Sequence, residues 1–125
     1  MLDAFLEKMA ATPFVDGQSD CVLTVADWIV LNGHPDPAAP YRRRYRTALG
    51  RERLLKRSGG LHALMAGGAI RAGLRPAPAP VRGDVGTLRH GGQVLAGICL
   101  GSRWAVKGNG LTVAVADEVL AAWSV

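Results

Sequence analysis

The sequence predicts an α+β fold, in which N-terminal helices pack on a small C-terminal antiparallel β-sheet. Before residue 74 the apolar residues recur at helical spacing, whereas after residue 81 short alternating runs are separated by glycine-rich turns. Between these halves, residues 75–80 have proline at every second position, which favours an extended connector outside the sheet. The 125 residues, 49% of them hydrophobic, suffice for one core, so residues 1–125 are expected to form a single domain.

The first half is expected to hold four helical segments. The first has apolar residues at positions 2, 5, 6 and 9 and ends near Thr12-Pro13. The second is expected to have Ser19 as its N-cap and to stop at Gly33. A third helical region extends from about residue 38 to residue 57 with an interruption at Gly50, and a fourth from residue 61 to about residue 72.

The second half is expected to form two β-hairpins. Residues 84–89 and 94–100 alternate as strands do and are joined by a turn at residues 90–92. Residues 103–106 and 111–115 form the second pair, and Asn109-Gly110 between them is the strongest hairpin signal in the chain. Residues 119–125 fit either a short helix or a last strand, with Trp123 as an anchor in the core.

Cys21 is the candidate catalytic residue, because it lies in the first turn of the expected second helix. The unpaired backbone N–H groups of a first turn favour a thiolate, which is a better nucleophile than a thiol. Free cysteine is also among the residues most often buried, so a small core side chain is the alternative interpretation of this position.

Composition argues against several other kinds of site. Cys21 and Cys99 do not make a disulfide framework, and the histidines His34, His62 and His90 are scattered. Neither a disulfide, nor a metal, nor a cofactor is therefore expected. No apolar run reaches the length of a membrane span, about 18 residues, and the N-terminus carries acids where a secretory signal is basic.

The net charge of +5 is concentrated in one segment, residues 42–57. Its basic side chains, opposed only by Glu52, are Arg42, Arg43, Arg44, Arg46, Arg51, Arg53, Lys56 and Arg57. Tyr41, Tyr45 and Leu49 recur four residues apart, which predicts a helix with an apolar seam beneath these charges. A nucleic-acid interface is one interpretation; a solvated face or a contact with an acidic protein neighbour is favoured, because no base-reading motif accompanies the charges.

The order of these parts resembles the NlpC-type papain-like cysteine peptidases, which cut peptidoglycan stem peptides. Asp20-Cys21 matches the Asp-Cys pair that opens the central helix of that family, and residues 82–85, Arg-Gly-Asp-Val, are similar to the segment that starts its sheet. Residues 96–101, Ala-Gly-Ile-Cys-Leu-Gly, look like the strand that brings its histidine to the cysteine. The resemblance implies a papain-like minimal domain over nearly the whole chain.

The chain resembles still more closely a small phage and prophage domain of about this length. The residues that carry this likeness are Asp20-Cys21, Ala26-Asp27-Trp28, Arg44-Tyr45, Gly50, Gly59-Gly60, Gly83-Asp84-Val85, Gly97-Ile98 and Ala122-Trp123-Ser124-Val125. The likeness implies a protein of the virion tail that is made in the bacterial cytoplasm. Its implied partners are other tail-tip or baseplate proteins, with peptidoglycan as the candidate substrate.

Leu95 stands where the peptidases carry their catalytic histidine, immediately before residues 96 and 97. Leucine cannot accept a proton from the cysteine, so a base would have to come from His34, His62, His90 or a partner chain. His90 lies five residues earlier, which is about 16 Å along a strand.

The strand that contains Leu95 also has a structural use. Alternation puts Leu95, Gly97 and Cys99 on one face, and we expect this face to meet the cysteine helix, with Cys99 near Cys21. An apolar cluster would then replace the catalytic pair.

The sequence is compatible with three functions. A catalytically degenerate tail-tip component with a structural or assembly role is preferred, because Leu95 replaces the histidine. The alternative is an active tail-associated cysteine peptidase, in which Cys21 attacks a peptide bond during cell-wall penetration. A nucleic-acid-binding domain rests on the arginine cluster alone and is the least favoured.

Overall fold

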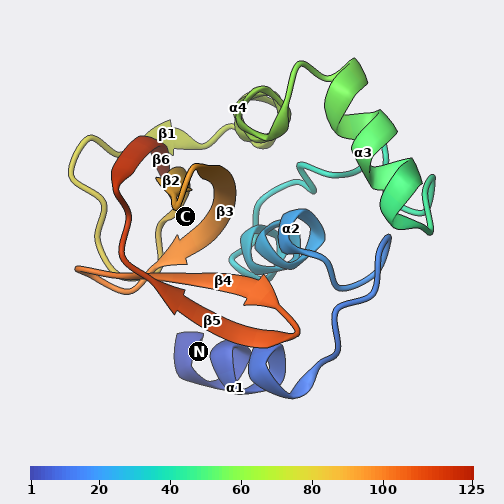
Figure 1. Cartoon of the computed structure of the whole chain (residues 1–125). Coiled ribbons are helices and arrows are strands. Elements are labelled where there is room, and N and C mark those ends of the chain that lie inside the picture. The colour runs from blue at the N-terminus through green and yellow to red at the C-terminus, as the bar shows by residue number, and fades with distance from the viewer.

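The computed structural model describes residues 1–125 and contains four helices followed by a six-stranded antiparallel sheet (Figure 1). The helices are α1 (Leu2–Ala11), α2 (Cys21–Leu31), α3 (Ala48–Arg57) and α4 (Leu61–Ala72). The strands are β1 (Arg75–Pro76), β2 (Val85–His90), β3 (Gln93–Cys99), β4 (Trp104–Gly108), β5 (Gly110–Ala114) and β6 (Glu118–Ser124). The predicted α+β class is therefore confirmed. None of the four helices has the length and hydrophobicity needed to span a bilayer.

The strands follow the order β1-β6-β2-β3-β4-β5, so the last strand inserts between β1 and β2. Residues 119–125, for which a helix and a strand were both open, thus belong to a strand. The connector, residues 75–80, was expected to contain no strand, and this is wrong for its first two residues. Arg75 pairs with Ser124, and Pro76 pairs with Trp123. Pro76 is tolerated there because β1 is an edge strand, where a missing N–H leaves no ladder bond unmade.

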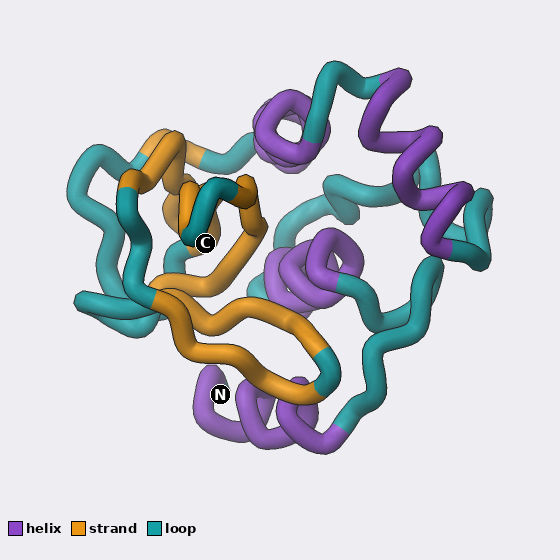
Figure 2. Tube along the Cα trace, viewed as in Figure 1, coloured by secondary structure: helices purple, strands orange, loops and turns teal.

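Both predicted hairpins are present, β2 with β3 and β4 with β5. The pairing between the two hairpins is short, consisting of Ile98 with Ala105 and Cys99 with Trp104. The sheet therefore bends where β3 meets β4. Figure 2 shows the strands curling at this bend, with α4, α2 and α1 arranged along the sheet and α3 at the far edge.

The main core lies between the sheet and the helices α1, α2 and α4. Met9 of α1, Leu23 and Trp28 of α2, and Ile98 of β3 are all buried in it. Trp123 of β6 belongs to the same core, as the sequence predicted.

A second, smaller core fills the opposite face of the curled sheet and consists of Leu88, Cys99, Trp104 and Ala122. Gly86 lets the Trp104 ring approach the sheet closely, since a Cβ at Gly86 would come within 2.9 Å of the ring and 2.6 Å of the Ala121 carbonyl oxygen. Both faces of the sheet are therefore apolar.

The third helix begins later than expected. Residues 37–43 form turns and residues 44–46 are irregular. α3 starts after Thr47, whose hydroxyl accepts a hydrogen bond from the Gly50 amide at 3.0 Å. Gly50 thus lies in the first turn of α3 and does not interrupt it. Tyr41 and Tyr45 are buried, but Leu49 is 57% exposed, so the predicted apolar seam does not exist as one helix face.

Candidate functional site

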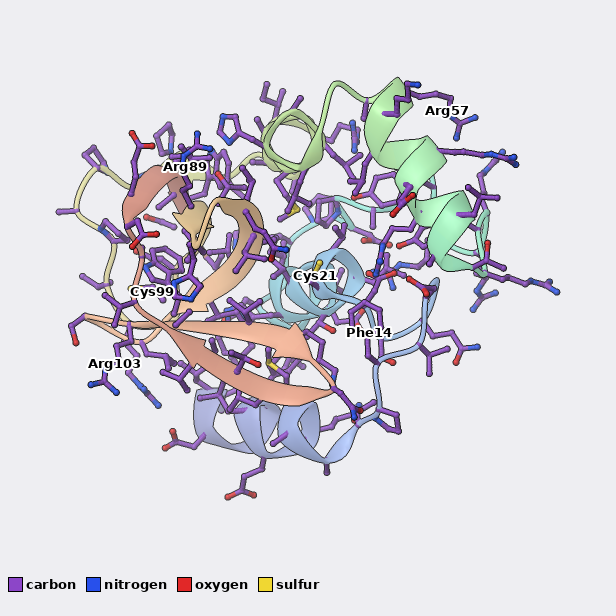
Figure 3. The ribbon with its side chains drawn as sticks, viewed as in Figure 1. Phe14, Cys21, Arg57, Arg89, Cys99 and Arg103 are labelled. Atoms are coloured by element: carbon purple, nitrogen blue, oxygen red, sulfur yellow. The ribbon has the colours of Figure 1, made fainter.

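Cys21 is the first residue of α2 and is half-buried (Figure 3). The N-cap is Asp20 and not Ser19: the Asp20 Oδ1 accepts a hydrogen bond from the Leu23 amide at 2.9 Å. Ser19 is engaged elsewhere, because its hydroxyl donates to the Pro13 carbonyl oxygen at 2.6 Å. The predicted position of the cysteine in the first turn is therefore correct, although the cap is shifted by one residue.

The Asp20 carboxylate is fully buried and is held by three donors. Besides the Leu23 amide, the Gly17 amide donates to Oδ2 at 3.0 Å, and the Tyr45 hydroxyl donates to the same oxygen. Burial, followed by this hydrogen bond, raises the pKa of Tyr45 far above its ordinary value. The sequence did not indicate this network, because Asp20 and Tyr45 are separated by 25 residues.

The positively charged Arg51 of α3 contacts the loop that precedes α2. Its guanidinium pairs with the Asp16 carboxylate at 2.8 Å and lies 5.1 Å from the centre of the Phe14 ring. Figure 3 places Phe14 in the segment that leads into α2. The charge of Arg51 lowers the pKa of the Cys21 thiol, but it is not the largest influence on that group.

Burial, with a smaller contribution from the Asp20 charge, raises the pKa of Cys21 to about 11. The backbone amides of Cys21 and Val22 lower it, which is the first-turn effect that the sequence predicted. Desolvation of the thiolate outweighs these amides, so the surroundings of Cys21 favour the thiol over the thiolate. The thiol is the form present at neutral pH.

No histidine forms a hydrogen bond with the Cys21 sulfur. His62 Nδ1 lies 2.7 Å from the Thr87 hydroxyl, and His90 Nδ1 lies 2.8 Å from the Val115 carbonyl oxygen. His34 follows the C-terminus of α2, so it is separated from Cys21 by the whole helix, about 16 Å at 1.5 Å per residue. The chain therefore does not bring the candidate nucleophile and a candidate base together.

The face of β3 that meets the helices is the opposite of the one expected. Ala96 and Ile98 belong to the main core with α2, whereas Cys99 lies in the second core and Leu95 packs against it. Cys99 is thus not near Cys21, and both cysteines are free thiols (Figure 3). Alternation alone defined two faces, and because both are apolar it could not show which one faces α2.

Other residues singled out in the sequence contact one another. The Trp28 indole N–H donates to the Gly83 carbonyl oxygen at 2.8 Å, which ties α2 to the turn before β2. Gly50 approaches Tyr45 closely, because a Cβ at Gly50 would lie 3.1 Å from the Tyr45 Cβ. These motif residues therefore hold the helices and the sheet together.

The arginine cluster divides into paired and unpaired side chains. Arg42 bridges Asp27 at 3.0 Å and Asp36 at 2.7 Å, and Arg51 pairs with Asp16. Four other arginines of the cluster have no ion pair and line the largest open groove of the molecule: Arg44, Arg46, Arg53 and Arg57.

The candidate nucleophile does not lie in a pocket, because Cys21 lines none of the five principal pockets. No group of three histidine, cysteine or acidic side chains is placed to hold a metal ion.

The raised pKa predicts a slow reaction of Cys21 with iodoacetamide at pH 7. A pKa of about 11 leaves about one molecule in ten thousand as thiolate, roughly a hundredfold fewer than for an unperturbed cysteine. The alkylation rate should rise steadily with pH up to about 11, and the Cys21→Ser variant should show how much Cys99 contributes. A rate that is already constant between pH 6 and 8 would contradict the raised pKa.

Comparison with known proteins gives one match. Neither the curated proteins nor the solved structures include a significant match to this chain. The model of a family described as a domain of unknown function, DUF6950, matches residues 1–125, which is the whole chain. The protein with this helical layer and this curled sheet therefore belongs to the DUF6950 family.

Proposed function

We propose that this protein is a tail-tip component of a phage, or of a phage-derived gene-transfer particle, with a peptidoglycan-endopeptidase-like domain that has lost catalysis. The surroundings of Cys21 carry the proposal. A cysteine opens a buried helix that packs on an antiparallel sheet, its thiol pKa is raised to about 11, and no imidazole is bonded to it. A helix that presents the cysteine supports a peptidase-like origin, and the absence of a hydrogen bond from any histidine of this chain to that cysteine supports the loss of catalysis.

The position of Leu95 indicates that one substitution would not restore a catalytic pair. Residue 95 lies on the face of β3 that turns away from α2. A histidine at this position would point into the second core, so Leu95→His alone should not produce a Cys–His pair. The assignment to a tail tip rests on the motifs that resemble the phage domain, among them Asp20-Cys21 and Gly83-Asp84-Val85.

The catalytic part of the proposal is tested by incubating purified protein with peptidoglycan fragments and following the release of stem peptides by mass spectrometry. We expect no release above that of the matched Cys21→Ser variant. Release that Cys21→Ser abolishes would establish the alternative, an active cysteine peptidase. The same assay with Leu95→His should also show no release.

The location is tested separately, on particles rather than on the purified chain. We expect mass spectrometry of purified phage or gene-transfer particles to detect the protein, and gold-labelled antibody to mark the tail end. Complete absence from such particles would overturn the tail-tip assignment, whatever the outcome with peptidoglycan.

A further inference from the structure

The largest open groove of the molecule is strongly basic. It lies between residues 40–47, α3 and α4, and has a volume of about 840 Å³. Its lining includes no acidic side chain, and its basic side chains are Arg44, Arg46, Arg53, Arg57 and Arg71. We call this feature the arginine groove.

The positive charges of the arginine groove are not neutralised within the chain. All five arginines are exposed, and none of them forms an ion pair. Arg71 alone has a hydrogen-bond partner, the Pro37 carbonyl oxygen at 2.8 Å, which leaves its charge uncompensated. A concave surface with several cations of one sign attracts an anionic ligand and raises its rate of association.

Apolar side chains flank these charges. Leu49 of α3 is 57% exposed, and it shares a helix face with Arg53, four residues later. Ile70 of α4 is 80% exposed and precedes Arg71. α3 itself is poorly covered, since Leu54 is its only buried residue, and Figure 1 shows it at the edge of the molecule, away from the sheet. The two helices that line the groove thus carry exposed apolar side chains close in sequence to its arginines, although neither Leu49 nor Ile70 belongs to the groove lining.

We infer that the arginine groove binds an acidic polypeptide segment, whose carboxylates pair with the arginines and whose apolar side chains cover Leu49 and Ile70. The guanidinium group suits carboxylates because its fork of N–H donors matches them in pairs. The volume lies within the range of about 300–1,000 Å³ that ligand pockets occupy, which fits a short extended segment. This inference goes beyond the proposed function and does not depend on it.

The aromatic residues of the groove argue for a peptide over a single-stranded nucleic acid. Proteins that bind single strands stack bases on exposed aromatic rings. Tyr41 and Tyr45 are each only 7% exposed, and the Tyr45 hydroxyl is occupied by Asp20. A phosphate backbone also offers no apolar groups to pack on the exposed leucine and isoleucine side chains, whereas the apolar side chains of an amphipathic acidic peptide would bury them.

The test uses the full chain and a short fluorescein-labelled peptide in which glutamate alternates with leucine. Fluorescence anisotropy at low ionic strength should report saturable binding that weakens as salt is added. The double variant Arg53→Glu/Arg57→Glu should bind the peptide at least about tenfold more weakly, because it reverses two charges of the groove.

The matched control is Arg75→Glu/Arg103→Glu, which changes the net charge by the same amount at exposed residues outside the groove. Figure 3 shows Arg103 on the side of the molecule opposite Arg57. The control should bind as the unmodified chain does. No binding of the peptide, or equal weakening in both variants, would overturn the inference. So would tighter binding of a single-stranded oligonucleotide that Arg53→Glu/Arg57→Glu abolishes, since the groove would then serve nucleic acid.

Discussion

Replacing Asp20 by alanine should lower the free energy of unfolding by at least about 3 kcal/mol. The loss of an N-cap costs about 1–2 kcal/mol, and each buried donor left without a partner costs about 1–3 kcal/mol. Asp20 serves both purposes, because it caps α2 and accepts from the Gly17 amide and the buried Tyr45 hydroxyl. Urea denaturation followed by circular dichroism measures the change.

Two further variants make this result specific. Glu7→Ala removes an exposed carboxylate of α1 that has no hydrogen-bond partner, and it should change stability by less than about 0.5 kcal/mol. Tyr45→Phe removes one of the donors, so Asp20→Ala combined with Tyr45→Phe should cost less than the sum of the two single changes. Equal effects of Asp20→Ala and Glu7→Ala would show that the network contributes nothing.

Trp28→Ala should be comparably destabilising, by about 3–5 kcal/mol, because it empties a large volume in the main core. The Trp28 side chain is 3% exposed, and its ring lies 5.2 Å from that of Phe5 in α1. It also donates to the Gly83 carbonyl oxygen, so one residue joins α2 to α1 and to the start of β2. Chemical denaturation again measures the effect.

Trp28→Phe separates the two contributions of this residue. It keeps an aromatic ring but removes the N–H donor to Gly83, and we expect a smaller loss, about 1–3 kcal/mol. Val113→Ala, at a residue that is 49% exposed, is a surface control and should cost less than about 1 kcal/mol. A loss for Trp28→Ala no larger than that of Val113→Ala would contradict the anchoring role.

The elements that follow from local chemistry were predictable from the sequence. The hairpin turn at Asn109-Gly110 and the breaks at Pro13 and Gly33 have local causes, and the structure contains the corresponding boundaries. The N-cap was less certain, since Ser19 and Asp20 are both good capping residues. The contact of Ser19 with Pro13, which local pattern does not reveal, leaves Asp20 as the cap.

The candidate site was predictable only in part. The place of Cys21 at the start of a helix follows from local sequence, but its raised pKa depends on burial by elements far along the chain. Tyr41 and Tyr45 have helical spacing, yet both are buried outside any helix, and the hydrogen-bond partner of Tyr45 is Asp20, far along the chain. Sequence periodicity shows which residues are apolar and at what spacing they recur. Which of them are buried, and against what, depends on contacts with residues far along the chain.

The position of α1 has a consequence for how the chain is made. Lys107 of β4 donates to the Thr12 carbonyl oxygen just after α1, a contact across 95 residues, and Figure 1 shows α1 beside the β4–β5 hairpin. During translation α1 leaves the ribosome well before β4 and β5, the strands that cover it. The nascent chain must therefore keep the apolar side of α1 soluble until β4 and β5 have emerged, and folding has to close a long loop before this contact forms.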